Sequence, residues 1–343
     1  MMNQQKKLYT LAKRLYEESF WDDYLKTDLI AIQLVNRKEP IIISILGKTK
    51  RNYGFLFHRN LEELACFFET ITKIEQQKFR SRLDIIQVQN CLSLEFENRD
   101  RISKEEYQLI KESGVPFRGK KSWPIFVDYF PGYHPSILDT VEVPLMIELL
   151  EKLIETAKDF RGKLAIYKDK KQPPEILMRT YQKNGDYKDG LFNVPNKIID
   201  RTFQLRSADP ILLTSFEMKR VSKKRIGSSI WEMDIDSMNT PVVHSDNERP
   251  YYPIVLLVLD SEDNEIICSE FFEPGDSEAI QRVLIQLILS ENKRPPTIVV
   301  STDQYDKIAG YLEKLLLNLE IELIPIKKLP MISVLKKGMQ EYL

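Results

Sequence analysis

The sequence has 343 residues, of which 43% are hydrophobic and 29% charged, and 50 Lys and Arg against 51 Asp and Glu give a formal net charge of -1. This composition excludes a disordered chain, and the length predicts about two folded domains. The balanced charge gives no overall attraction to nucleic acid or to anionic lipid, so any electrostatic site must be a local patch.

The cysteines and apolar runs indicate the compartment. Cys66, Cys91 and Cys268 lie far apart without any CxxC pair, which predicts buried, reduced thiols rather than a zinc site or a disulfide framework. Charged residues interrupt the first helix, so it does not read as a secretory signal. The longest clean apolar run, Ile254–Leu259, is too short to span a bilayer. We therefore expect a cytoplasmic protein with no membrane partner.

Hydrophobic periodicity predicts alternating helices and strands in the first half. Asn60 and Ser103 are expected helix N-caps, Glu106 would complete a capping box with Ser103, and Asn184-Gly185 is typical of a hairpin turn. In chain order we expect a helix through Leu8, Leu11 and Leu15, strands at Leu29–Val35, Pro40–Leu46 and Tyr53–His58, a helix after Asn60, a strand at Cys91–Glu97, a helix after Ser103, a strand at Trp123–Tyr129, a helix at Thr140–Phe160, and hairpin strands at Ile176–Tyr181 and Tyr187–Phe192.

The basic region Pro195–Gly227 contains the predicted domain boundary, near residue 207. This gives an N-terminal α/β domain with a trailing hairpin over residues 1–207 and a C-terminal α/β domain over 208–343. The second half predicts strands at Ile230–Asp236, Tyr252–Asp260 and Glu265–Glu273, a helix capped by Asp276 or Ser277, a strand at Thr297–Thr302, a helix at Tyr305–Leu319, a strand at Ile321–Ile326 that Pro325 puts at an edge, and a last helix from Ile332.

The element order of the second half, with three strands followed by helix, strand, helix, strand and helix, resembles a ribonuclease-H-like fold. The unalternating run Ile254–Leu259 would be a strand buried on both faces, and the Thr297 strand would enter a parallel crossover. The first half can be read in the same order, which suggests internal duplication as a hypothesis.

An acidic strand carries the most suggestive chemistry. Glu232, Asp234 and Asp236 would share one strand face, opposite Trp231, Met233 and Ile235. A divalent metal would neutralise their repulsion and could serve phosphoryl transfer. The other interpretation is the solvated face of an edge or half-exposed strand beside basic neighbours such as Arg225.

The W-x-x-D strand ending in Asp234, the hairpin near Asp260 and the strand leading to Asp303 make residues 228–343 resemble the catalytic cores of ribonuclease-H-like integrases and transposases. The resemblance implies Asp234 and Asp303 as ligands of Mg²⁺ or Mn²⁺, Glu341 as the third catalytic acid, and a nucleic-acid substrate. Gln304 departs from the glycine usual in that family, and Glu341 lies where the chain end is expected to fray. The corresponding first strand of the N-terminal half has no acid.

Two further features are candidates for binding. Phe130-Pro131-Gly132-Tyr133-His134-Pro135 predicts a rigid turn, in which Tyr133 and His134 either line a small-molecule pocket between the domains or are merely structural. The cluster Lys219, Arg220 and Lys223–Arg225 could contact phosphates, but no aromatic is interleaved, so a solvated linker is the default interpretation.

The whole chain is similar to a family of bacterial proteins, mostly from Firmicutes, with no assigned function. The similarity is carried by W-P-x-F, P-G-Y-x-P and W-E-x-D, by Tyr252-Pro253 and by Arg294-Pro295-Pro296. It implies tandem domains and a cytoplasmic setting. The leading hypothesis is a non-catalytic intracellular binding or interaction protein without a cofactor, with a protein or small-molecule partner. The alternative is the Mg²⁺- or Mn²⁺-dependent nuclease.

Overall fold

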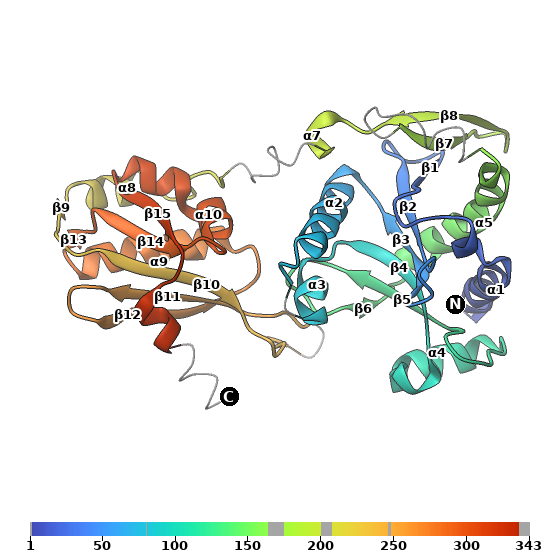
Figure 1. Cartoon of the computed structure of the whole chain (residues 1–343), viewed down its shortest axis with the longest axis horizontal. Coiled ribbons are helices and arrows are strands. Elements are labelled where there is room, and N and C mark those ends of the chain that lie inside the picture. The colour runs from blue at the N-terminus through green and yellow to red at the C-terminus, as the bar shows by residue number, and fades with distance from the viewer. Residues whose placement is uncertain (1, 80, 164–174, 200–207, 246–247, 336–343) are drawn as a thin grey trace. The chain divides into compact units, whose positions relative to one another are not determined.

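The computed structural model describes residues 2–79, 81–163, 175–199, 208–245 and 248–335. The chain divides into two compact units, the first comprising Met1–Pro131 and Pro135–Arg201 and the second Gly132–His134 and Thr202–Leu343. The predicted boundary near residue 207 lies outside the described residues. Each unit contains a sheet flanked by helices (Figure 1), so the predicted mixed α/β class is confirmed.

The first unit is built on an eight-stranded sheet in the order β6-β5-β4-β3-β2-β1-β7-β8. Neighbouring strands are antiparallel except β1 and β7, which are parallel. The strands are β1 (Ile30–Gln33), β2 (Ile41–Leu46), β3 (Tyr53–His58), β4 (Cys91–Glu97), β5 (Trp123–Tyr129), β6 (Ser136–Ile137), β7 (Glu175–Tyr181) and β8 (Tyr187–Asn193).

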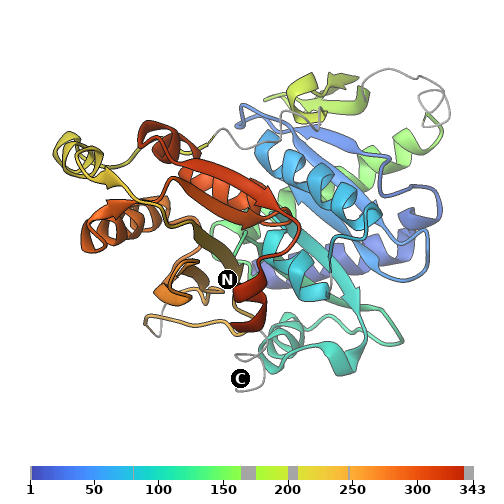
Figure 2. The same ribbon diagram turned by 60° about the vertical axis from the view of Figure 1, so that its left-hand side comes forward.

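Helices cover both faces of this sheet, which is why its central strands β1–β4 bury side chains on both sides. The helical elements are α1 (Met2–Glu18), η1 (Phe20–Asp22), α2 (Leu61–Glu75), α3 (Arg82–Val88), η2 (Arg99–Arg101), α4 (Lys104–Ser113), α5 (Glu142–Arg161) and α7 (Asn196–Ile199). Helices α1 and α5 pack on one face, and α2 lies on the other (Figures 1 and 2). Asn60 caps α2, and Ser103 with Glu106 forms the predicted capping box.

The duplication hypothesis is wrong. In the ribonuclease-H-like order the fourth strand would lie parallel beside the first, but β4 pairs antiparallel with β3 and continues the meander into β5. The place beside β1 is taken by β7, which comes much later in the chain. Periodicity identified these strands correctly but carries no information about which strands become neighbours.

The second unit has a five-stranded sheet in the order β12-β11-β10-β14-β15. Its first three strands in sequence pair antiparallel, whereas β10–β14 and β14–β15 are parallel. The strands are β10 (Trp231–Ser237), β11 (Ile254–Asp260), β12 (Glu265–Phe272), β14 (Thr297–Ser301) and β15 (Glu322–Ile326). Helices α9 (Ser277–Ser290) and α10 (Tyr305–Asn318) form the crossovers. This is the ribonuclease-H-like order predicted for this half, with β11 buried throughout and Pro325 in an edge strand.

The sheet of the second unit is also covered on both faces. Trp231, Met233 and Ile235 project toward α9 and α10 in the larger core. On the other face, Leu329 and Ile332 pack with Leu259, and residues 330–335 are helical. The basic region that gave no clear elements from sequence contains α8 (Ser215–Ser222), β9 (Arg225–Ile226) and, paired with β9, β13 (Lys293–Arg294).

Two expectations about individual segments can be checked in the described residues. Cys91 and Cys268 are buried, Cys66 is partly buried, and none of the three is disulfide-bonded. No helix in the described part of the chain is both long and apolar enough to cross a membrane.

Candidate functional site

The acidic face of β10 is buried. Glu232 and Asp234 are each only 4% exposed, because β10 lies between β11 and β14 and residues 330–335 cover that side of the sheet. The backbone N–H of Ile332 donates to Oε2 of Glu232 over 3.3 Å. The interpretation of this face as an exposed or half-exposed strand surface is therefore wrong for Glu232 and Asp234, and fits only the partly exposed Asp236.

The two predicted metal ligands lie on neighbouring parallel strands. Met233 is in register with Val300, so Asp234 and Asp303 both lie toward the carboxyl ends of β10 and β14. Asp303 is exposed, beyond the end of β14, and Glu341 lies outside the described residues. Within the described ranges no group of three His, Cys, Asp or Glu side chains could hold a metal ion. The catalytic and metal-binding roles of these residues stay predictions.

Tyr133 and His134 pair through their backbones with the segment Pro250-Tyr251. Tyr133 pairs antiparallel with Tyr251, and the N–H of His134 donates to the carbonyl of Pro250 over 2.8 Å. Gly132 has φ 82°, and a Cβ there would lie 2.3 Å from the Pro274 ring, so this turn requires glycine. These contacts give the turn a structural role, and the binding role of Tyr133 and His134 stays a prediction.

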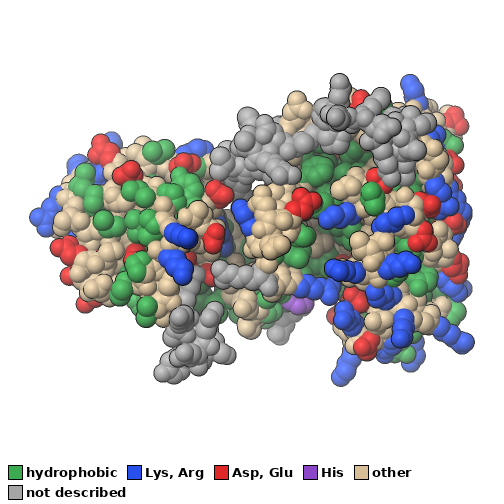
Figure 3. Space-filling view, viewed as in Figure 1, with side chains coloured by type: hydrophobic (Ala, Val, Ile, Leu, Met, Phe, Trp, Pro, Cys, Tyr) green, Lys and Arg blue, Asp and Glu red, His purple; other side chains and the backbone are tan. Residues whose placement is uncertain are grey.

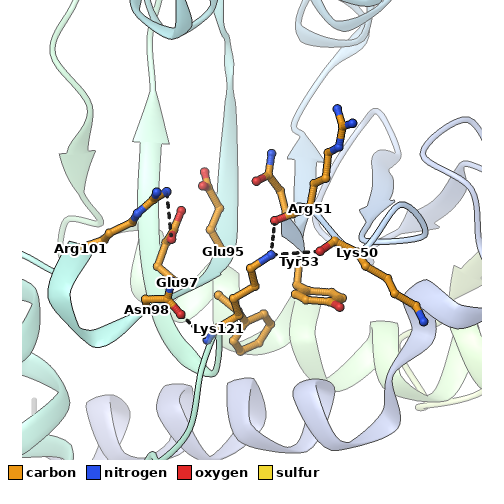
Figure 4. Close-up of a pocket in the computed structure, with 10 residues that line it drawn as sticks. Lys50, Arg51, Tyr53, Glu95, Glu97, Asn98, Arg101 and Lys121 are labelled. Carbon is orange, nitrogen blue, oxygen red and sulfur yellow. Dashed lines mark hydrogen bonds and ion pairs between the residues drawn. The ribbon is translucent and has the colours of Figure 1, made fainter.

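A hollow of about 260 Å³ in the first unit carries charges of both signs (Figure 4). We call it the mixed-charge hollow, and it is lined by Lys50, Arg51, Asn52, Tyr53, Glu95, Phe96, Glu97, Asn98, Arg101 and Lys121. The Lys121 ammonium donates to the carbonyls of Lys50 and Arg51 over 3.0 and 2.8 Å. Glu97 lies 3.9 Å from Arg101. The chain itself therefore satisfies much of this charge.

Glu95 is a partly buried carboxylate of this hollow. Burial raises its pKa, against the opposing effects of the Tyr129 hydroxyl, Arg82 and the Ser93 hydroxyl. The Tyr129 hydroxyl donates to Oε1 of Glu95 over 2.8 Å. Glu95 could not be identified as a candidate from the sequence, because its only signal there is a single Glu in an alternating strand.

A second hollow, of about 410 Å³, is lined by Arg220, Lys223, Lys224, Arg225, Leu289 and Asn292. We call it the basic hollow. Figure 3 shows Lys and Arg side chains at the end of this unit where Figure 1 labels β9 and β13. Four of its six lining residues are cations and none is an acid, so this hollow has a strongly positive potential.

Local structure holds these cations in place. Thr214 and Glu217 form a capping box at the start of α8, and Val221 is fully buried in the core. Glu217 also forms an ion pair with Arg282 of α9 over 2.5 Å. Arg220 therefore lies in the last turn of an anchored helix, and Lys223 is its C-cap residue. Within the basic hollow, the Lys224 ammonium donates to the side-chain oxygen of Asn292.

Neighbouring cations outside the basic hollow are satisfied by the chain. Lys293 lies 3.3 Å from the buried carboxylate of Asp260, and Arg294 donates to the carbonyls of Lys224 and Leu319. Burial alone would raise the pKa of Asp260, but the Ser229 hydroxyl, the Glu262 amide and Lys293 lower it overall. By contrast, none of the four cations of the basic hollow forms an ion pair with a carboxylate in the described ranges.

Two family models match this chain. Residues 6–179 match the model of a domain of unknown function, DUF7309, over about half of the chain. The chain belongs to the DUF7309 family. Residues 217–340 match a second domain of unknown function, DUF6930. The mixed-charge hollow therefore lies entirely within the DUF7309 match, and the basic hollow entirely within the DUF6930 match.

Two solved structures show a distant similarity to this DUF7309 protein. The magnesium complex of the HTLV-2 integrase catalytic core domain is 12% identical, with 35% of this chain and 74% of that chain covered and a TM-score of 0.24. The Mos1 strand transfer complex is 12% identical, with 78% and 77% covered and a TM-score of 0.19. No curated protein matches the sequence. At such low TM-scores the fold assignment rests on the strand order described above.

Proposed function

We propose that this protein is a non-catalytic binding protein that holds a phosphate-bearing polyanion in its basic hollow. The observation that carries the proposal is the convergence of Arg220, Lys223, Lys224 and Arg225 without a carboxylate partner in the described ranges. Cations held close together repel one another, and a multivalent anion relieves that repulsion. Guanidinium groups also donate two parallel hydrogen bonds to phosphate oxygens, which favours this class of anion.

The position of the basic hollow supports binding without catalysis. β9 comes just before β10, and β13 comes just before β14, so the hollow lies at the edge where these parallel strands begin. Asp303 follows the other end of β14, roughly 15 Å along the strand. A phosphate in the basic hollow would therefore not reach the acids proposed for metal binding.

The net charge of the chain bears on how polyanion binding should depend on salt. With a formal charge of -1, the protein has no general affinity for polyanions, so binding must come from the local patch. Affinity should fall steeply with salt, because each neutralised phosphate releases counterions.

The test is calorimetric titration of the full chain with long-chain inorganic polyphosphate at several salt concentrations. We expect the double variant K223E/R225E to lose affinity by about 100-fold, since two charged contacts are replaced by repulsion. The matched control is K314E, the same charge change at an exposed position of α10 outside the basic hollow. Absence of binding, or equal loss in both variants, would refute the proposal.

A second candidate is the divalent-metal-dependent nuclease. It is favoured by one observation, that Asp234 and Asp303 lie toward the carboxyl ends of adjacent parallel strands in a ribonuclease-H-like sheet. The described residues alone do not complete a metal site there. The test is cleavage of a labelled oligonucleotide with Mg²⁺ or Mn²⁺, which D234N should abolish. Absence of metal-dependent cleavage by the wild type would remove this candidate.

The bacterial origin and the cytoplasmic setting stay predictions. A protein or small-molecule partner is likewise a proposal, and Tyr133 and His134 are the residues proposed for small-molecule binding.

A further inference from the structure

Phe216 is an exposed aromatic side chain beside the basic hollow. Its exposure is 69%, although it lies on α8, whose Val221 is fully buried. The helix is therefore anchored without Phe216, and this ring has no packing role that would explain it. Single exposed apolar residues are common, so the neighbours of Phe216 decide whether it has another role.

Arg220 connects the ring to the basic hollow. Phe216 and Arg220 are four residues apart on α8, so they lie on the same side of the helix, about one turn apart. The guanidinium carbon of Arg220 lies 5.9 Å from the centre of the Phe216 ring, and Arg220 also lines the basic hollow. An aromatic platform and a phosphate-binding group are therefore contiguous on one surface.

We infer that the polyanion bound by the basic hollow is single-stranded nucleic acid, with a base stacked on Phe216. This inference rests on the proposed function. A single strand offers both phosphates and unstacked bases, and base–aromatic stacking accepts any base because each has a π-face. In a duplex the bases are already stacked and face inward, so Phe216 would have no base to contact. Arg220 would contact phosphate and add a cation–π contribution at the same ring.

The experiment measures fluorescence anisotropy of the full chain with labelled oligo-dT and oligo-U of about twelve nucleotides, and with a duplex of the same length. We expect F216A to weaken binding of single strands about tenfold, to leave polyphosphate binding unchanged, and to be rescued by F216W. K223E/R225E should weaken the binding of both ligands. The oligo-dT and oligo-U arms distinguish DNA from RNA as the preferred strand.

Phe271 provides the matched control. It is an exposed phenylalanine, 58% accessible on β12, and does not line the basic hollow, so F271A should not change binding. If F216A weakens single strands no more than polyphosphate, or if the duplex binds as tightly as the single strand, the inference is wrong while the proposed function stands. If polyphosphate does not bind to the wild type, the proposed function itself fails.

Discussion

The two hollows of this protein are both lined by charged side chains, but the chain satisfies those charges differently. In the mixed-charge hollow Glu97 lies beside Arg101, and Lys121 donates to two backbone carbonyls. In the basic hollow four cations have no carboxylate partner in the described ranges. The comparison teaches that the number of charges lining a surface does not identify a binding site. The difference that matters is that Glu95 and Glu97 lie among the cations of the mixed-charge hollow, whereas no acid lines the basic hollow.

The same contrast holds between neighbouring cations of the second unit. Lys293 is held by the buried Asp260, whereas Lys223, the C-cap residue of α8, is exposed and has no such partner. Lys293 is therefore assigned to the stability of the fold and Lys223 to a ligand.

The largest effect is expected for D260A. Asp260 is 2% exposed and accepts from the Ser229 hydroxyl and the Glu262 N–H, so its removal leaves Lys293 without its partner. We expect a loss of about 3 kcal/mol in the free energy of unfolding at pH 7, measured by urea denaturation. The pKa of Asp260 is lowered in the folded state, so its contribution is fully present at pH values well above the unfolded value of 3.8 and is lost as the pH falls through the folded pKa.

The control for D260A is D263A, in the same turn but exposed. It should change the free energy of unfolding by less than about 0.5 kcal/mol. Equal effects for the two variants would mean that the Asp260–Lys293 pair is not structural.

Glu95 should show the opposite dependence on pH. Its pKa is raised by burial, so above the unfolded value of 4.5 the folded state keeps its proton longer than the unfolded state does. Stability of the wild type therefore falls as the pH rises through this window, and E95Q should be the more stable protein at pH 7. We expect a gain smaller than the loss in D260A. Thermal unfolding of both proteins at pH 4 and pH 7 measures this gain. If the stability difference between E95Q and the wild type were the same at both pH values, the prediction would be contradicted.

A smaller effect is expected for R101A in the mixed-charge hollow. Arg101 is mostly exposed and pairs with Glu97 at 3.9 Å, so the loss should be about 0.5 kcal/mol. Polyphosphate binding should not change. A marked loss of binding would place the polyanion site in the first unit.

The smallest effect on stability is expected for K223E. Lys223 is exposed and has no carboxylate partner in the described ranges. The free energy of unfolding of the variant should therefore stay within about 0.5 kcal/mol of the wild-type value, while polyphosphate binding weakens. Urea denaturation measures the free energy of unfolding, and calorimetric titration of the same preparation measures binding. A clear loss of stability would show that this cation, like Lys293, supports the fold.

Local features of the fold could be predicted from particular residues. The Ser103–Glu106 capping box, the Asn60 cap and the hairpin around Gly185 depend on contacts between residues close in sequence. The unalternating run Ile254–Leu259 also identified a strand buried on both faces. The order of elements was then enough to predict the sheet of the second unit.

The incorrect predictions concern features that depend on contacts between segments distant in sequence. Nothing in the residues of β4 indicates that it pairs with β3 rather than β1, because strand neighbours depend on which segments return to the sheet. Likewise, alternation put Glu232 and Asp234 on one face, but their burial depends on residues 330–335, about 100 positions away. The sequence pattern therefore could not distinguish an exposed acidic face from a covered one.

The sequence by itself determined that residues 219–225 are densely basic and that the protein as a whole is neutral. Only the tertiary structure decided that four of the cations there share a hollow with Leu289 and Asn292 of another segment, and that Phe216 stands exposed beside Arg220. The physical reason is that charge and side-chain type are properties of single residues, whereas pairing and exposure depend on contacts made across the folded chain.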